Sequence, residues 1–268
     1  MSNSLSDVFA VQRVLDREET SNMYNSIYFH SNERLKEIFS NVDVKDKDVL
    51  TVLASGDQAF YAYDNGAKSV DTFDINKLAI HYYYLRTWVI KYMNLFYPED
   101  INNKFIKRII NLVEPCSAEE KSSLRFWRKY IKFFSDDDTY ELFCFSDNPD
   151  INKINDISRI RKRIKSDKVN FYNVDISGKI NIDKKYNIIF TSNIGDHIIH
   201  DEDTFKLYRD NLDGLLADDG KIVCSNVLRG RASILERRVF GDKFNSEDLP
   251  YIDDEYFTGA PGYVYTRK

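Results

Sequence analysis

The sequence predicts an α/β domain of three layers, with helices on both faces of a mostly parallel sheet. Apolar runs of strand length alternate with longer helical patterns over residues 49–97 and again over residues 152–268. The first run stops abruptly at Ser55-Gly56-Asp57 before apolar residues resume, which is typical of a buried strand that turns into a helix. This alternation predicts parallel strands joined by right-handed crossovers.

The composition limits the classes of function. The chain has 268 residues, enough for one large domain or for one domain with an insertion. Its net charge of −5 argues against nucleic-acid binding through a global positive field. With 18 Tyr and 18 Phe, the chain can build a sizeable buried core.

The cysteines and the N-terminus indicate the compartment. Cys116, Cys144 and Cys224 show neither paired nor metal-like spacing, which fits a reducing cytosol better than a disulfide scaffold. The N-terminus has no basic patch followed by an apolar stretch. No run approaches the roughly 18 apolar residues of a membrane helix. We therefore expect a cytoplasmic protein without a membrane span.

The elements follow from hydrophobic periodicity. Residues 1–47 are expected to form a helical N-terminal segment, and residues 48–268 the main domain. The strands of that domain are expected, in chain order, at 49–54, 69–75, 169–176, 186–194 and 220–228. Its helices are expected at 58–67, 76–96, 154–166, 203–216 and 233–241. The end of the chain, 251–268, is expected to form an antiparallel hairpin around "TGAPG".

One block departs from this alternation. Residues 99–150 contain two helical patterns, over 101–113 and 118–134, and then an irregular polar stretch. Because the block interrupts an alternating pattern, it is interpreted as a helical insertion. Surface insertions of this kind cost little loop-closure entropy and often cover a site.

Polar side chains follow four of the predicted strands where each strand ends. Open parallel sheets bind ligands at the carboxyl ends of their strands, so these side chains are expected to converge on one ligand. The candidate binding residues are Ser55, Gly56, Asp57 and Gln58 after the first strand, Asp74, Ile75 and Asn76 after the second, Asp175 and Ile176 after the third, and Ser192 and Asn193 after the fourth.

The spacing of two acidic residues points to an adenosine-containing ligand. Asp74 follows Gly56 by 18 residues, close to the roughly 20 at which a carboxylate meets the ribose of a dinucleotide. An ionised carboxylate can accept hydrogen bonds from both hydroxyls of one ribose. Asp175 is expected to accept from an adenine amino group, with Ile75 and Ile176 on the two faces of the ring.

These segments resemble the successive motifs of the class I S-adenosylmethionine-dependent transferases, the methyltransferase superfamily. The matching stretches are "SGDQAF", "VDTFDIN", "FYNVDI", "IIFTSNIGD" and "LLADDGKIV", within residues 48–97 and 152–268. The first two are most similar to the branch of the betaine-lipid-synthesis 3-amino-3-carboxypropyltransferase. The resemblance implies a Rossmann-like fold whose seven-stranded, mostly parallel sheet has an antiparallel last strand. It also implies S-adenosyl-L-methionine as the cofactor.

The first loop departs from the pattern of that family. It has one glycine, and residues 54–56 replace the usual Gly-x-Gly. A sulfonium cofactor has no pyrophosphate to cradle, so one glycine for close backbone approach suffices. Thr51 stands where the family usually has an acidic residue, and Asp57 or Gln58 is expected to hold the amino-acid end of the cofactor instead.

Catalytic candidates follow the fourth strand. Asp196 and His197 stand where such transferases position the acceptor, and they are the candidates for a general base or a positioning role. His200 follows three residues after His197, but no further ligand set is visible, so no metal site is expected. The basic run 159–165 is interpreted as a solvated helix face rather than a nucleic-acid or lipid patch.

The sequence thus predicts an S-adenosylmethionine-dependent transferase that moves a methyl or a 3-amino-3-carboxypropyl group to a small-molecule or lipid-like acceptor. A non-catalytic S-adenosylmethionine-binding or interaction protein is the main alternative. An NAD-dependent oxidoreductase is a weaker one, because the pyrophosphate of NAD favours a Gly-x-Gly-x-x-Gly loop. The acceptor, the carbon transferred and the oligomeric state stay open.

Overall fold

The computed structural model describes residues 31, 33–76, 78–93, 103–130, 157–166, 169–196, 198, 201–225, 231–253 and 258–268. Most of the predicted N-terminal helical segment, namely residues 1–30, lies outside these residues, as do the irregular stretch after 134, Cys144, His197 and His200.

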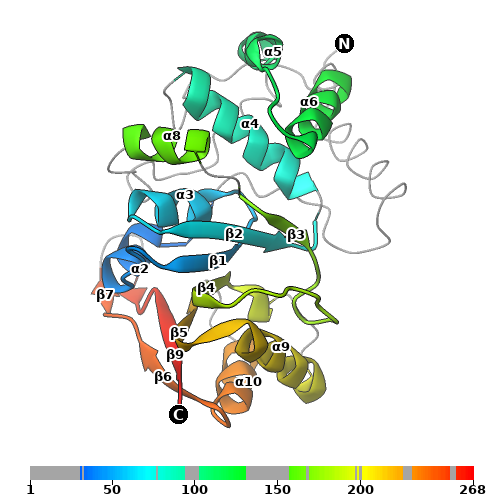
Figure 1. The fold of residues 1–268 in the computed structure, drawn as a ribbon. Coiled ribbons are helices and arrows are strands. Elements are labelled where there is room, and N and C mark those ends of the chain that lie inside the picture. The colour runs from blue at the N-terminus through cyan, green and yellow to red at the C-terminus, as the bar shows by residue number, and fades with distance from the viewer. Residues whose placement is uncertain are drawn as a thin grey trace.

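A seven-stranded sheet forms the middle layer (Figure 1). Its strands are β1 (Asp48–Val52), β2 (Ser69–Asp74), β3 (Phe171–Asn173), β4 (Tyr186–Ser192), β5 (Leu216–Ser225), β6 (Phe244–Asp248) and β9 (Gly262–Arg267). Their order across the sheet is β3-β2-β1-β4-β5-β9-β6. The pairs among β1 to β5 are parallel, whereas β9 runs antiparallel to both of its neighbours. The predicted fold, mostly parallel with a reversed last strand, is confirmed.

Helices cover both faces of this sheet (Figure 1). One face carries α2 (Leu35–Asn41), α3 (Asp57–Asp64), α4 (Leu78–Met93) and α8 (Ile157–Ser166), and the other carries α9 (Glu202–Leu215) and α10 (Arg231–Phe240). Two further helices, α5 (Asn103–Leu112) and α6 (Ala118–Tyr130), lie beyond α4. Among the described residues, no helix is long and apolar enough to cross a membrane.

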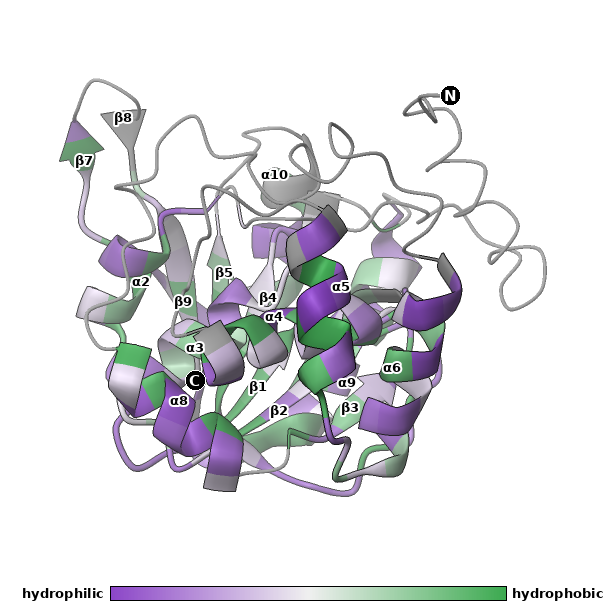
Figure 2. Cartoon of the chain, turned by 90° about the horizontal axis from the view of Figure 1, so that it is seen from above, coloured by the Kyte–Doolittle hydropathy of each residue, from purple (hydrophilic) through white to green (hydrophobic). Residues whose placement is uncertain are grey.

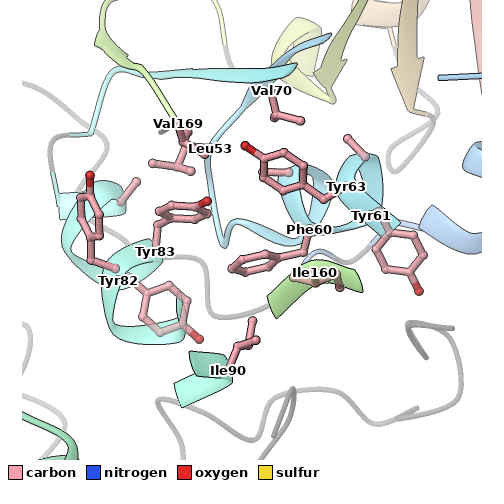
Figure 3. Packing of buried hydrophobic residues seen from close by; sticks show 14 of the residues in the cluster. Leu53, Phe60, Tyr61, Tyr63, Val70, Tyr82, Tyr83, Ile90, Ile160 and Val169 are labelled. Carbon is pink, nitrogen blue, oxygen red and sulfur yellow. The ribbon is translucent and has the colours of Figure 1, made fainter. Parts of the chain in front are cut away.

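The core under α3 and α4 is aromatic (Figure 3). Phe60 of α3 stacks on Tyr83 of α4 with ring centroids 5.2 Å apart. Phe39 of α2 stacks on Phe190 of β4 at 4.6 Å, so the segment before β1 belongs to the same core as the sheet. Rings of this size bury a large apolar area each, which is the main driving force for closing this face.

The opposite face lacks a helix between β3 and β4. The chain from 174 to 185 crosses it without regular structure, and Ile176, Ile180 and Ile182 pack into its core. Asn211 of α9 donates to the carbonyls of Ile176 and Gly178, at 2.8 and 2.7 Å. Side-chain bonds thus replace the hydrogen bonds that a crossover helix would make internally.

The helices α5 and α6 pack on α4 through a buried apolar face. The indole nitrogen of Trp127 donates to the carbonyl of His81 at 2.8 Å, and the His81 ring stacks on Phe126 at 4.4 Å. Burial lowers the pKa of His81 to about 4. Figure 2 shows α6 and α8 hydrophilic over much of their surface, while β1 is mostly hydrophobic. The basic run in α8 is partly structural, because Arg163 donates to the carbonyls of Ala67 and Lys68.

Several predicted boundaries are corrected. The third strand is only Phe171–Asn173, and β5 begins at Leu216 rather than 220, because Leu216 already pairs with Tyr186 of β4 ahead of an irregularity in the register. The edge strand β6 was not predicted, since only Phe244 of its five residues is buried and no apolar alternation marks it.

The C-terminal hairpin is also corrected. The strand β7 (Ile252–Asp253) pairs with β8 (Thr258–Gly259) in a separate small sheet. The strand β9 pairs instead with β5 and β6, so "TGAPG" is not the turn of a simple hairpin. Because β9 lies between β5 and β6, the backbone groups on both of its edges pair with a neighbouring strand, whereas in a terminal hairpin only one edge would pair.

Candidate functional site

The loop between β1 and α3 needs glycine at one position. Gly56 has φ +85°, and a Cβ there would lie 2.9 Å from Cδ2 of Tyr83. Ala54, two residues earlier, also has a positive φ of 41°. The left-handed backbone and the aromatic neighbour together explain why one glycine is enough to make this turn.

Asp74 lies against this loop, as the sequence predicts. Its Oδ2 accepts a hydrogen bond from the backbone N–H of Ala54 at 2.8 Å, and its Oδ1 accepts from the N–H of Asn76 at 2.8 Å. Asn173 of β3 donates to the carbonyls of Asp74 and Ile75, at 2.9 Å each. The ends of β1, β2 and β3 are therefore tied together around one carboxyl group.

Asp74 is 9% exposed. Burial raises its pKa to about 6, although the N–H groups of Asn76 and Ala54 oppose the rise. A carboxylate with a raised pKa at the ligand-binding edge of an α/β sheet is a candidate for a functional group. Each oxygen keeps acceptor capacity beyond its backbone bond, because a carboxylate oxygen has two lone pairs.

Asp57 has a different environment. Its side chain is fully buried, its Oδ1 pairs with Nη1 of Arg86 at 2.7 Å, and its Oδ2 accepts from Ser31 N and Ser55 Oγ at 2.7 Å each. Burial would raise the pKa of Asp57, but the Arg86 guanidinium and these hydrogen bonds hold it below its usual value. Arg86 also donates to the carbonyl of Ser55 at 2.8 Å. Asp57 therefore fixes the loop and the segment at Ser31.

Gln58 connects the first strand to an unexpected residue, Glu33. The amide oxygen of Gln58 accepts from Thr51 Oγ1 at 2.5 Å, and its nitrogen donates to Glu33 Oε2. The hydroxyls of Ser192 and Ser225 both donate to Glu33 Oε1, with Ser192 at 2.5 Å. A carboxyl group from the N-terminal segment thus lies where β1, β4 and β5 end.

The end of β4 carries the other predicted residues. Ser192 has φ +57°, Asn193 follows it half-buried, and Ile194–Asp196 form the short 3-10 helix η2. A Cβ at Gly195 would displace Oε2 of the buried Glu236. The hydroxyl of Ser192 donates to Glu33. The catalytic role of Asp196 and His197 stays a prediction.

The predicted residues after β2 and β3 lie in different environments. Ile75 and Asn76 are half-buried beside Asp74. Asp175 is exposed, and its Oδ1 accepts from the N–H and hydroxyl of Ser177 at 2.9 and 2.6 Å. Ile176 is 3% exposed and belongs to the apolar core. The placement of Ile75 and Ile176 on the two faces of an adenine ring stays a prediction.

Sequence reasoning missed Glu33, Arg86 and Ser225. Arg86 carries a signal, because a lone arginine inside the apolar helix α4 requires a buried partner. Glu33 carries none, because an acidic residue just before a helix is ordinary. Within the described part of the chain, no group of three His, Cys, Asp or Glu residues is arranged to hold a metal ion.

No family model matches this chain, and no curated protein sequence does. Solved structures are similar to it at low identity. A TehB-like SAM-dependent methyltransferase from Corynebacterium glutamicum is 12% identical, with 98% of each chain covered and a TM-score of 0.44. The N-methyltransferase NodS from Bradyrhizobium japonicum, in complex with S-adenosyl-L-homocysteine, is 8% identical over 95% of each chain, with a TM-score of 0.46. A ribosomal protein methylase from Lactobacillus delbrueckii is 15% identical over 88% of this chain and 77% of its own, with a TM-score of 0.42.

Proposed function

We propose that the protein is an S-adenosyl-L-methionine-dependent transferase that binds its cofactor at the carboxyl ends of β1, β2 and β4. The single observation that carries the proposal is the hydrogen bond from Ala54 N to Asp74 Oδ2. It places a carboxylate at the turn after β1, on the edge where open α/β sheets bind ligands. Asp74 would accept hydrogen bonds from the two ribose hydroxyls.

The neighbouring residues suit an adenosine. Ile75 is half-buried and offers an apolar surface for the ring, while the exposed Asp175 is the candidate for the adenine amino group. Gly56 makes the left-handed turn that brings the loop to Asp74, and Ser55, Asp57 and Asn76 hold the loops in place. Within this proposal, Gln58, Ser192 and Asn193 face the amino-acid end and the acceptor.

The cofactor would supply a sulfonium that makes each attached carbon electrophilic. The task of the protein is then to align the acceptor nucleophile with one carbon and to exclude water. Methyl transfer is the more general reaction of such folds, and the sequence resembles the aminocarboxypropyl branch. The nature of the product decides between them, because methyl transfer leaves S-adenosylhomocysteine and aminocarboxypropyl transfer leaves methylthioadenosine.

The test is direct. The purified protein is analysed by native mass spectrometry for a bound nucleoside, and titrated by calorimetry with S-adenosylhomocysteine and with NAD. We expect saturable binding of S-adenosylhomocysteine and none of NAD. Binding of NAD alone, or of neither ligand, would overturn the proposal. Product analysis with cell extract as the acceptor source then separates a transferase from a non-catalytic binding protein.

A further inference from the structure

Glu33 is buried, and its hydrogen-bond partners among the described residues are neutral. The residue is 3% exposed, and four neutral groups donate to its carboxylate. The donors to Oε2 are Ser31 Oγ, at 2.9 Å, and Gln58 Nε2, and the donors to Oε1 are Ser192 Oγ and Ser225 Oγ. Among the residues that the structure describes, no Lys, Arg or His lies within ion-pair distance of it.

Asp57 provides the contrast. It lies in the same region, also buried, but Arg86 pairs with it at 2.7 Å. A buried carboxylate is costly unless it is paired or well hydrogen-bonded, and hydroxyl donors only partly replace water. Four donors and no acceptor around Glu33 suit an ionised carboxylate, since that group only accepts hydrogen bonds. These four donors fill the acceptor positions of the carboxylate but carry no charge, so a ligand cation that replaced one of the serine hydroxyls would compensate its negative charge.

The position of Glu33 relative to Asp74 indicates which part of a ligand would supply this positive charge. Asp74 ends β2, whereas the Glu33 donors Ser192 and Ser225 end β4 and β5. The strands β2 and β4 flank β1, so they lie about 10 Å apart at the usual strand spacing. An adenosyl ligand whose ribose meets Asp74 would extend its amino-acid arm across the end of β1 toward Glu33. That arm ends in an ammonium group.

We propose that Glu33, held by Ser192, Ser225 and Gln58, binds the α-ammonium of the cofactor and thereby selects ligands that carry the amino-acid arm. This inference rests on the proposed function. It gives Glu33 the role that the sequence assigned to Asp57 or Gln58. Gln58 then positions Glu33, because it bridges Thr51 and the Glu33 carboxylate.

The first experiment needs no mutation. Calorimetry on the wild-type protein compares four ligands: S-adenosylhomocysteine, its deaminated analogue, its decarboxylated analogue and methylthioadenosine. We expect the deaminated analogue to bind roughly tenfold to a hundredfold more weakly than S-adenosylhomocysteine, the range for losing a hydrogen bond to a charged group. The decarboxylated analogue keeps the ammonium and should bind better than the deaminated one. Equal affinities of these two analogues would overturn the proposal.

The second experiment uses Glu33→Gln with Glu37→Gln as the matched control. Glu37 lies on the same segment, one helical turn further along, and pairs with Arg34 at 3.1 Å. We expect Glu33→Gln to weaken S-adenosylhomocysteine by at least roughly tenfold while changing methylthioadenosine by less than about twofold. Glu37→Gln should change neither. An equal loss for both ligands in Glu33→Gln would show that Glu33 is only structural.

The outcomes separate this inference from the proposed function. If the wild type binds no adenosyl ligand, the proposed function itself fails. If the wild type binds all four ligands equally well, the cofactor site stands and the role of Glu33 is wrong. Should Glu33→Gln not fold, as judged by circular dichroism, the wild-type ligand series still decides.

Discussion

Two carboxyl groups at the same edge of the sheet are held in opposite ways. Asp74 accepts from the backbone N–H groups of Ala54 and Asn76, both close to strands that the sequence marks. Glu33 accepts from the side chains of Ser192, Ser225 and Gln58, which come from three separate elements. The first arrangement is part of the local path of the chain, and the second exists only once the sheet has closed.

The contacts around each carboxyl group therefore depend on different parts of the chain. The contacts around Asp74, the Asp74 half of the site, depend on the turn at Gly56, because that turn directs Ala54 N toward the carboxylate. The contacts around Glu33, the Glu33 half of the site, depend on the segment at Ser31, which Asp57 and Arg86 anchor through Ser31 N. Single substitutions can therefore disturb one half at a time.

Arg86→Met should have the largest effect and should act on the Glu33 half. It leaves Asp57 buried without its cation, which costs about 3–5 kcal/mol of unfolding free energy. Urea denaturation of the variant measures this loss. The control Arg125→Ala, at an exposed position of α6, should stay within about 0.5 kcal/mol of the wild type. A combined Arg86→Met and Asp57→Asn variant should recover part of the loss, since position 57 then holds no buried charge that lacks its partner.

Gly56→Ala should come next and should act on the Asp74 half. The comparison is with Gly66→Ala, because Gly66 has nearly the same φ, +84°, and its nearest neighbour for a Cβ is at 3.6 Å. Both variants carry the left-handed backbone cost of about 1–2 kcal/mol. Only Gly56→Ala adds the collision with Tyr83, which we expect to raise its cost by a further 1–3 kcal/mol or so. Equal melting temperatures would show that the turn yields without strain.

Asp74→Ala should weaken S-adenosylhomocysteine by one to two orders of magnitude, about 1.5–3 kcal/mol for lost hydrogen bonds to a charged group. Calorimetry measures the affinity, and circular dichroism confirms that the variant is folded. Asp203→Ala, at a side chain that is 97% exposed on α9, is the control and should bind like the wild type. Unchanged affinity in folded Asp74→Ala would remove Asp74 from the ligand site.

The smallest effect is a pH dependence that belongs to the Asp74 half alone. Ribose hydroxyls donate to the ionised carboxylate, and the pKa of Asp74 is about 6, so affinity should fall as pH drops through 6. Between pH 7.5 and pH 5 we expect roughly a tenfold loss, and Asp74→Asn should show a flat profile. Stability responds in the opposite sense. Because the pKa rises from 3.8 in the unfolded chain to about 6 on folding, the contribution of Asp74 is full below 3.8 and is lost as pH rises through 6.

Hydrophobic periodicity in the sequence predicts the parallel strands β1 to β5 and the end of β2 at Asp74, whereas the antiparallel last strand was expected only from the family resemblance. Strands and crossover helices follow from periodicities of two and 3.6 residues, which are local, and parallel strands necessarily end at a shared edge. For the same reason the helices at α3, α4, α8, α9 and α10 were predictable, while β6 was not, because its exposed residues lack any alternation.

The contacts around Glu33 could be identified only from the folded structure. Glu33 lies 159 positions from Ser192 and 192 positions from Ser225, and their hydrogen bonds depend on how β4 and β5 close on the N-terminal segment. Ile176 likewise turned inward because no helix covers the crossover between β3 and β4. Contacts between distant segments leave no periodic trace in a single sequence, since any polar residue near a strand end could have made them. These contacts could not be predicted because the burial of a side chain and its hydrogen-bond partners are set by the whole folded chain, not by the type of residue alone.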